Sequence, residues 1–334
     1  MLFTIFSHAD GWRENEMQVK VFIKSQQDAQ ELAALRLNGD YFGKYAILYL
    51  VPSELQKIQN LQLDHEIQIE NLNEHYRNFW TNRDDYTSFD EIIDIMDSLA
   101  TAFPDICSKT VYGSSVDGRE LSALKISDNV EIDEPEAEVM FDGGIHGDEI
   151  GCSENLIRFS RYLCYEYGND QYVTDLINDR EIWIYVCVNP DGRVNTSRYN
   201  SNGVDLNRDW GYMWDEWGNS PGAFSQPESK ALRECMYNNQ FVIHTSYHSG
   251  TEYISYPWSY RSDPCPDQSH IDFLANVYST QSGYANLEYG QGNSGMYAIN
   301  GSTKDSNYGI MGSVSWSMEI SYSKQPPASQ IMMY

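Results

Sequence analysis

Two residues three positions apart, His146 and Glu149, carry side chains that can bind one metal ion. They follow the strand predicted over residues 138–141 and a stretch with two glycines, which lets the backbone turn sharply at the strand's carboxyl end. A single helical turn would point both side chains at the same ion. A neutral imidazole and a carboxylate suit Zn²⁺, which at a catalytic site needs a third protein ligand and an open position for water. Alone, an HxxE pair is a weak signal.

The third ligand has to come from the remainder of the chain's seven histidines. His244 and His248 both follow an apolar strand predicted over residues 240–243. His244 is so close to that strand that a buried, hydrogen-bonded histidine is the simpler interpretation. We favour His248, which stands beside Ser249 and Gly250, where a loop at the site belongs. The other histidines lie in the N-terminal region or in a polar stretch: His8, His65, His75 and His270.

Strands and helices alternate in the region that contains these ligands. Ser88 with Glu91 predicts a helix start, and the apolar residues from Phe89 to Leu99 have helical spacing. Further strands are predicted over residues 123–126, 138–141, 182–186 and 240–243, and a helix over residues 155–167. This order predicts an α/β fold with a mixed, mostly parallel twisted sheet flanked by helices. The predicted domain covers residues 88–334.

The first 75 residues show a separate pattern. Strands are predicted over residues 18–23, 46–51 and 66–69, with a helix after Ser25 and Asp28 and another after Pro52. That order predicts a small α+β open sandwich of residues 1–75, near the lower size for independent stability. Residues 76–87 are polar and charged. We expect them to form either a connection that proteases reach or an ordinary ordered linker.

Composition excludes several classes of partner. The net charge of -27 argues against nucleic acid or an anionic membrane, because the chain would be repelled from phosphate. Because no run of 18 apolar residues occurs, we expect no membrane span. Residues 1–6 are too short and lack the basic flank of a complete signal peptide. The six cysteines show no CxxC spacing, which argues against a cysteine-based zinc site and leaves disulfides open.

Five motifs in one order make the sequence resemble the zinc metallocarboxypeptidases of the carboxypeptidase A type, over roughly residues 84–323. They are similar to the family's HxxE, NPDG, R-x-N-x-x-G-x-DLNR and HS…YP(W/Y) segments and to the strand that carries its catalytic Glu. In this chain they lie at residues 146–149, 189–192, 198–208, 248–258 and 316–319. The first 75 residues also resemble the family's activation pro-segment, including the Pro-Ser-Glu-Leu pattern at residues 52–55.

The resemblance implies a role for each matching residue at the reaction centre. His146, Glu149 and His248 would hold one Zn²⁺, which would polarise the scissile carbonyl and lower the pKa of water. Glu319 would act as the catalytic base and pass the proton to the leaving amine. Arg198 would stabilise the oxyanion that forms at the attacked carbonyl.

The resemblance also implies how the substrate is held. Asn207 and Arg208 would bind the terminal carboxylate, Arg208 by a planar two-point pairing. Tyr297 has the spacing of the family's mobile tyrosine that caps the substrate. Asp205 would accept a hydrogen bond that orients His146. Without the other motifs, Arg208 and Asp205 would be interpreted as a structural ion pair and Tyr297 as a surface aromatic.

Two positions depart from the family's animal digestive members, and the end of the chain differs too. Asp148 stands where those members carry Arg, which removes a positive charge from the outer substrate path. Lys304, seven residues after Tyr297, falls at the base of the side-chain pocket. We expect it to favour a C-terminal Glu or Asp, because a buried ammonium needs a counter-charge. Pairing with Asp305, or a stem that points to solvent, are the alternatives. After Glu319 the family's long final helix has no counterpart, so the chain either lacks it or is a fragment.

The sequence therefore predicts a zinc-dependent carboxypeptidase that acts on peptide and protein C-termini and is autoinhibited by residues 1–75. Two alternatives are a peptidase of the same fold that cleaves cell-wall peptides or side-chain tails, and a non-catalytic peptide-binding module. The retained Glu319 and metal ligands argue against the binding module. The resemblance further implies a secreted or periplasmic protein.

Overall fold

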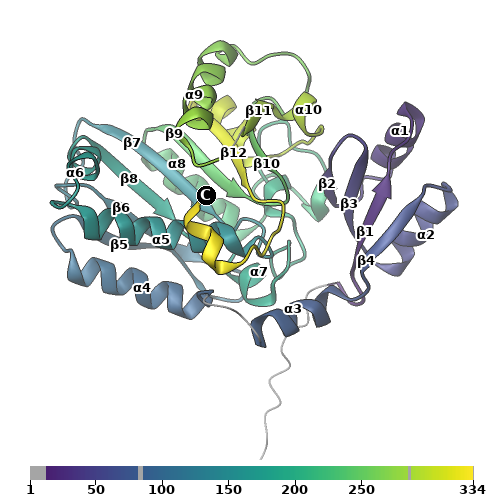
Figure 1. The fold of residues 1–334 in the computed structure, drawn as a ribbon, viewed down its shortest axis with the longest axis horizontal. Coiled ribbons are helices and arrows are strands. Elements are labelled where there is room, and N and C mark those ends of the chain that lie inside the picture. The colour runs from purple at the N-terminus through teal and green to yellow at the C-terminus, as the bar shows by residue number, and fades with distance from the viewer. Residues whose placement is uncertain (1–12, 82–85, 285–286, 334) are drawn as a thin grey trace, which may run out of the picture.

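Two separate β-sheets organise the chain in the computed structural model, which describes residues 13–81, 86–284 and 287–333 (Figure 1). A four-stranded sheet belongs to the N-terminal unit, residues 13–81, and an eight-stranded sheet belongs to the larger unit that begins at residue 86. Each sheet packs on its own hydrophobic core. In Figure 1 the two units lie side by side and α3, the last helix of the N-terminal unit, runs beneath both.

The N-terminal unit contains the predicted succession of strand, helix, strand, helix and strand. Its elements are β1 Met17–Phe22, α1 Gln26–Ala34, β2 Gly39–Tyr41, β3 Tyr45–Leu50, α2 Pro52–Asn60, β4 His65–Ile69 and α3 Leu72–Thr81. The strand order is β2-β3-β1-β4 with antiparallel neighbours, and α1 and α2 lie on the side away from the larger unit (Figure 1). Ser25 and Asp28 form the predicted capping box. Strand β2 and helix α3 were not predicted, and β2 has only three residues, too few to show a period.

The large sheet is mixed, with a parallel centre and largely antiparallel edges. Its strands are β5 Cys107–Ser114, β6 Glu120–Ile126, β7 Ala137–Gly143, β8 Arg180–Tyr185, β9 Phe241–His248, β10 Glu252–Tyr256, β11 Glu288–Gln291 and β12 Val314–Ile320. They are arranged in the order β11-β10-β12-β9-β7-β8-β6-β5. The central neighbours β8-β7-β9-β12 are parallel, as are β10 and β11, which confirms the predicted fold class. The carboxyl ends of β7, β9 and β12 therefore open at the same edge, where α/β folds place their sites.

Helices cover both faces of this sheet. The longer ones are α4 Phe89–Ala102, α5 Ile150–Glu166, α6 Gln171–Asn178, α8 Pro227–Asn238 and α9 Gln268–Gln281. Short helices lie in the loops: α7 Pro190–Asn195, α10 Gly292–Gly295, α11 Thr303–Ser306, the 3₁₀ segments η1 Leu206–Arg208, η2 Trp217–Asn219 and η4 Ala328–Met333, and the π-helical η3 Asn307–Met311. Alternate residues of β7 serve the two faces: Phe141 packs against the core beneath α4, α5, α6 and α9, and Met140 packs with α8.

The connection between the two units begins in a helix that the sequence analysis did not predict. Helix α3 continues to Thr81, so residues 76–81 are helical. Residues 82–85 of the predicted connection lie outside the described residues. After β12 the described chain forms only the short segment η4, whose Ile331 packs with Tyr86 and Ile150. Across the described residues, the structure contains no helix of the length and apolarity that crossing a membrane requires.

A buried carboxylate, Asp209, organises the long loop that follows η1. Its Oδ1 atom accepts hydrogen bonds from the Ser220 hydroxyl at 2.6 Å and the Ser225 backbone N–H at 3.1 Å. Its Oδ2 atom accepts from the Gln226 backbone N–H at 3.0 Å and from the Ser229 hydroxyl. The loop residues that donate to it therefore depend on this one charge, next to Arg208 in sequence.

We predict that Asp209→Ala destabilises the chain by about 3 kcal/mol, because hydrogen bonds to a buried charge are strong and the donors are left without a partner. Urea unfolding followed by circular dichroism measures the change. Asp105→Ala, at an exposed aspartate, is the control and should stay within about 0.5 kcal/mol of the wild type. Equal loss in both variants would contradict the organising role of Asp209.

Candidate metal centre and active site

The loop after β7 carries His146 and Glu149. The Glu149 backbone N–H donates to the His146 carbonyl at 3.2 Å, and Glu149 then caps the start of α5. The two side chains thus share a tight turn ahead of the helix, not the helical turn that their spacing suggested. Gly147 is required in this turn, because a Cβ there would lie 1.9 Å from the backbone carbonyl carbon of Gly192.

Asn189, in the NPDG motif, stabilises the close packing of Gly147 against Gly192. Its Oδ1 atom accepts from the Gly192 backbone N–H at 2.9 Å, and its Nδ2 atom donates to the Ile145 carbonyl at 3.2 Å. Both contacts are buried. The motif therefore serves as the scaffold of the loop that presents His146.

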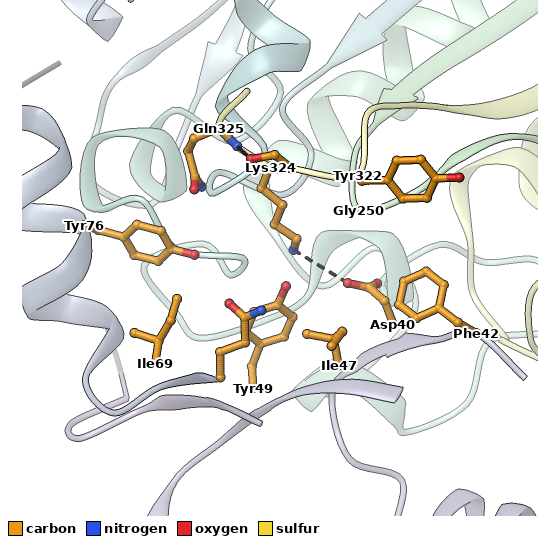
Figure 2. A pocket seen from close by; sticks show the side chains of 12 residues that line it. Asp40, Phe42, Ile47, Tyr49, Ile69, Tyr76, Gly250, Tyr322, Lys324 and Gln325 are labelled. Atoms are coloured by element: carbon orange, nitrogen blue, oxygen red, sulfur yellow. Dashed lines mark hydrogen bonds and ion pairs between the residues drawn. The ribbon is translucent and has the colours of Figure 1, made fainter. Parts of the chain in front are cut away.

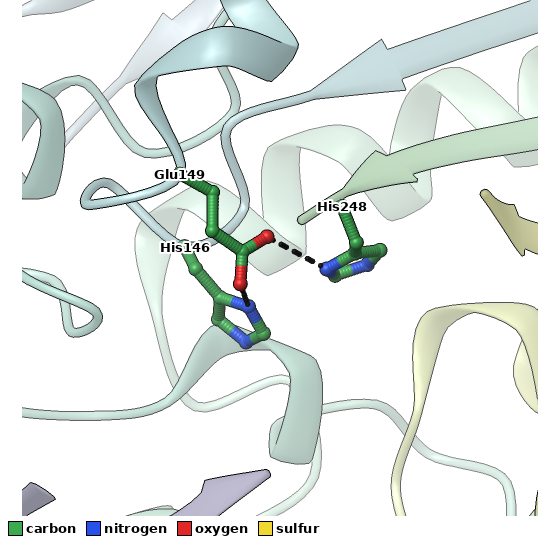
Figure 3. A group of neighbouring side chains, drawn as sticks. All are labelled: His146, Glu149 and His248. Carbon is green, nitrogen blue, oxygen red and sulfur yellow. Dashed lines mark hydrogen bonds and ion pairs between the residues drawn. The ribbon is translucent and has the colours of Figure 1, made fainter. Parts of the chain in front are cut away.

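The three predicted metal ligands meet in one buried group (Figure 3). The Glu149 carboxylate lies between the two imidazoles, with Oε1 2.8 Å from His146 Nδ1 and Oε2 3.1 Å from His248 Nδ1. One candidate ligand atom from each residue lies within 4.8 Å of the others. We had predicted that His248 follows the strand, but it is the last residue of β9 itself. Two imidazole nitrogens and a carboxylate match the donors that catalytic zinc sites use.

The charges around this group favour an ionised Glu149. Burial opposes its ionisation, but His146, Lys324 and His248 hold the pKa of Glu149 well below its usual range. Burial lowers the pKa of His248, which keeps its imidazole neutral and able to bind a metal. Burial and Arg198 oppose protonation of His146, yet Glu149 and Asp205 raise its pKa, so a proton and a cation would compete for that ring.

Asp205 supplies the hydrogen bond that the sequence predicted for it. Its Oδ1 atom lies 3.1 Å from His146 Nε2, which leaves Nδ1 pointing at Glu149. The same carboxylate accepts from Arg198 Nε at 3.0 Å and from the Asn207 backbone N–H at 2.9 Å. Asp205 thereby ties the metal ligand to two residues of the predicted substrate site.

His244 is buried away from the metal group, as the simpler interpretation predicted. Its ring contacts the Asp142 carboxylate and lies 2.8 Å from the Ser315 hydroxyl. Asp142 also accepts from the Ser246 hydroxyl, which lies 3.4 Å from His248 Nε2. His244 therefore supports the strand beneath His248 and is not a fourth ligand.

Glu319 lies on β12, directly opposite His248 on β9. Both residues line the inner pocket, a narrow hollow that is also lined by His146, Glu149, Asn207, Tyr297 and Lys304. Burial, followed by the charges of Glu149 and Asp40, raises the pKa of Glu319 well above that of an ordinary carboxyl. A carboxylate that readily takes up a proton beside a metal group is suited to general-base chemistry.

Asn207 and Arg208 lie on η1 behind the inner pocket. Asn207 Oδ1 accepts from the backbone N–H and the hydroxyl of Thr303, which leaves the amide NH₂ for other partners. Arg208 is buried, donates to the Asn207 carbonyl at 2.9 Å and packs over Trp217. Its Nε–H has no acceptor among the described residues. A buried guanidinium with an unused donor is ready to receive a carboxylate.

Arg198 reaches the metal group from the loop after α7. Its Nη1 atom lies 3.4 Å from His146 Nδ1 and 3.9 Å from Glu149 Oε1. Its Nη2 atom is buried and finds no acceptor among the described residues. A buried donor without an acceptor is available to a bound ligand.

Lys304 forms part of the inner pocket and is 4% exposed, so its stem does not point to solvent. Its ammonium donates to the Ser255 hydroxyl at 2.9 Å. Asp305 turns the other way and accepts from the backbone N–H groups of Ser259 and Tyr260. Burial lowers the pKa of Lys304 to about 8, although Asp305 and Glu319 partly offset the effect. The ammonium therefore lacks a directly bonded counter-charge within the described chain.

The structure adds two charged residues that the sequence did not reveal. Asp40, on β2 of the N-terminal unit, lines the inner pocket and accepts from Tyr297 Oη at 3.3 Å and Arg198 Nη1 at 3.5 Å. Lys324, after β12, lies 3.0 Å from Asp148 Oδ2. Neither stands in a motif, because each is brought to the site by tertiary packing alone.

Comparisons with known proteins agree with this geometry. A family model described as zinc carboxypeptidase matches residues 92–334. Carboxypeptidase SOL1 of Arabidopsis thaliana is 32% identical over 253 residues, which cover 70% of this chain and 51% of that protein. Carboxypeptidase A1 of Mus musculus is 28% identical over 255 residues, or 67% of this chain and 59% of that protein. The chain thus spans between half and three fifths of these curated relatives.

Solved structures share the fold of the whole described chain. Carboxypeptidase A from Helicoverpa armigera superposes with a TM-score of 0.79 at 18% identity, covering 96% of this chain and 94% of the other. Thrombin activatable fibrinolysis inhibitor superposes with a TM-score of 0.76 at 20% identity, covering 95% and 94%. At these identities the likeness concerns the fold.

We expect the wild-type chain to bind about one zinc ion. We predict that each of the variants His146→Ala, Glu149→Gln and His248→Ala loses this ion. Asp205→Asn should keep zinc but bind it about 10- to 100-fold more weakly, because the ring of His146 loses its acceptor. Elemental analysis after dialysis, followed by competition with a chelator, measures both effects. His270→Ala, at an exposed histidine, should behave as the wild type. Full zinc content in the His248 variant would contradict the proposed ligand set.

Proposed function

The chain belongs to the zinc carboxypeptidase family, and on that premise we propose that it removes single amino acids from the C-termini of peptides. The observation that carries the proposal is the inner pocket, where the candidate zinc ligands and Glu319 adjoin Asn207 and the buried Arg208. A buried guanidinium that has an unused donor and is bonded to the carbonyl of the pocket residue Asn207 favours a substrate with a free terminal carboxylate.

The proposed mechanism assigns each step to a residue of the pocket. Zinc held by His146, Glu149 and His248 would supply Lewis acidity at the scissile carbonyl and lower the pKa of water. Glu319 takes a proton from the attacking water and delivers it to the leaving nitrogen, a transfer that its raised pKa supports. Arg198 donates Nη2–H to the oxyanion.

Other residues hold the substrate in place. Arg208 and the amide of Asn207 bind the terminal carboxylate and so set which peptide bond lies over the metal. Tyr297 lines the same pocket and closes over the terminal residue. These contacts restrict cleavage to the last residue, because an internal residue has no free α-carboxylate for Asn207 and Arg208 to bind.

The side chain of the terminal residue enters the part of the pocket that ends at Lys304. Ser255, Ser259 and Ser317 line this part, and Gly292 leaves room for the stem of Lys304, whose Cε would lie 3.1 Å from a Cβ at that position. Hydroxyl groups and one ammonium form a polar floor. We propose that this floor selects a C-terminal Glu or Asp, whose carboxylate provides the counter-charge that Lys304 lacks.

We predict that blocked dipeptides ending in Glu are cleaved faster than those ending in Phe, Leu or Lys. Lys304→Met should lower kcat/KM for the Glu substrate about 100-fold, as expected for loss of a buried ion pair, and leave the Phe substrate unchanged or improved. The ammonium is present below its pKa of about 8, so the preference for Glu should fade as the pH rises through that value. Steady-state kinetics across the panel measure both effects. Faster cleavage of Phe than of Glu by the wild type would refute the preference.

We also propose that the N-terminal unit holds the chain inactive. Asp40 enters the inner pocket and contacts Arg198 and Tyr297, two residues assigned here to the substrate. The ring of Tyr41 packs on Tyr297 with centroids 5.3 Å apart. A substrate cannot take its place while these side chains remain, so the unit has to move away before catalysis.

We predict that cleavage of the chain between Arg77 and Arg83 raises peptidase activity. Part of this segment lies outside the described residues. Asp40→Ala should raise the activity of the uncut chain about tenfold, because it removes charged hydrogen bonds that hold the unit in place. Glu70→Ala, at an exposed residue of the same unit, is the matched control and should change nothing. Activity is followed on one dipeptide substrate before and after limited proteolysis, and equal rates for cut and uncut chains would rule out inhibition.

A further inference from the structure

Asp40 marks the point where two hollows meet. On one side lies the inner pocket with Lys304 and the candidate zinc ligands. On the other lies the outer pocket, a hollow between the two units, whose walls include Tyr49 and Tyr76 of the N-terminal unit and Tyr322 and Lys324 of the larger unit (Figure 2). Asp40 lines both.

Lys324 is the cation of the outer pocket. Its ammonium lies 3.7 Å from Asp40 Oδ2, 3.0 Å from Asp148 Oδ2 and 3.5 Å from Glu149 Oε1. It also sits over the ring of Tyr49 at 4.4 Å from the centroid. Figure 2 shows the side chain reaching from the segment after β12 toward Asp40. The sequence suggested that Asp148 removes a positive charge from the outer substrate path. The structure places another positive charge, that of Lys324, beside Asp148.

The Asp40 carboxylate is held from two directions. Oδ1 faces Arg198 and Tyr297, and Oδ2 faces Lys324. Two of these groups, Arg198 and Tyr297, belong to the proposed reaction centre, whereas Lys324 borders it and lies 3.5 Å from Glu149 Oε1. The intact chain therefore already contains one carboxylate, that of Asp40, bound beside Lys324.

A substrate must follow the same path once the N-terminal unit has moved away. Its last residue occupies the inner pocket, held by Asn207 and Arg208, so the residue before the scissile bond lies where Asp40 was. The side chain of that penultimate residue then faces the wall that the larger unit contributed to the outer pocket, which includes Tyr322 and Lys324. Departure of Asp40 and Tyr49 leaves Lys324 with two carboxylate partners, Asp148 and Glu149, and an ammonium has three N–H donors to share.

We propose that Lys324 is a specificity-determining residue that binds the carboxylate of an acidic penultimate residue in the substrate, in the place that Asp40 takes in the intact chain. This inference rests on the proposed carboxypeptidase function. Asp148 limits the attraction, because its own charge partly neutralises Lys324 across 3.0 Å. The two residues together set the preference for acid at this position.

The test compares two blocked peptides that share the best C-terminal residue and differ only in a penultimate Glu or Gln. The purified full-length chain is assayed before and after limited proteolysis. The wild type should favour Glu about tenfold in kcat/KM, chiefly through KM. Lys324→Met should bring the ratio to about one, Lys324→Arg should keep most of it, and Asp148→Asn should increase it. Added salt should reduce the preference in the wild type and have no effect on the ratio in Lys324→Met.

Bound zinc is measured in every variant, because Lys324 and Asp148 border the ligand Glu149, and only zinc-loaded preparations are compared. An equal Glu and Gln rate in the wild type, or an undiminished ratio in Lys324→Met, would overturn the role of Lys324. Failure to cleave any peptide would instead overturn the proposed function. In that case calorimetric titration of the same two peptides decides the inference: tighter binding of the Glu peptide that depends on Lys324 sustains it, and equal binding refutes it.

Discussion

The buried carboxylate of Glu149 is the constraint on which the rest of the site depends. A charge in the interior has to be compensated, and the imidazoles of His146 and His248 and the ammonium of Lys324 are arranged around it. Asp205 fixes the ring of His146 from behind. A divalent cation bound by these ligands would complete the compensation of the Glu149 charge, which the neighbouring positive groups supply only in part. The sheet supplies the precision, since the carboxyl ends of its parallel strands converge at this point.

The same constraint links the two units of the chain. The cleft around the metal group holds more positive donors than the acids of the larger unit satisfy, with unused hydrogen-bond donors on Arg198 and Arg208. Such a surface attracts a carboxylate, and the N-terminal unit offers Asp40 from the short strand β2. The contact that holds the unit in place thus uses Arg198 and Tyr297, two side chains that we propose contact the substrate. These two side chains link the proposed catalysis to its proposed inhibition.

Local sequence patterns predicted the sheet and several residues of the candidate site, but they did not predict the residues that tertiary packing alone brings to the site. The glycine-rich turn after a strand and the HxxE spacing made His146 and Glu149 candidate ligands, and alternation of strands and helices predicted the sheet. The resemblance to a known family then assigned roles to these ligands and to Glu319. Asp40 escaped prediction because β2 has three residues, too few for a period, and its meaning depends on how two separate units dock. Lys324 stands in no motif, and its position depends on the course of the loop after β12. Helix α3, Leu72–Thr81, was not predicted, and its last six residues fall in the segment that we expected to connect the two units.

The most direct test of the central claim measures bound zinc and peptide hydrolysis together in wild-type chain and in Glu319→Gln. The substitution keeps the shape of the side chain and removes the base, while the three proposed ligands stay intact. The account predicts that the variant keeps about one zinc ion per chain and loses hydrolysis by about 1,000-fold, the scale of a general base. Undiminished hydrolysis in Glu319→Gln with zinc still bound would contradict it.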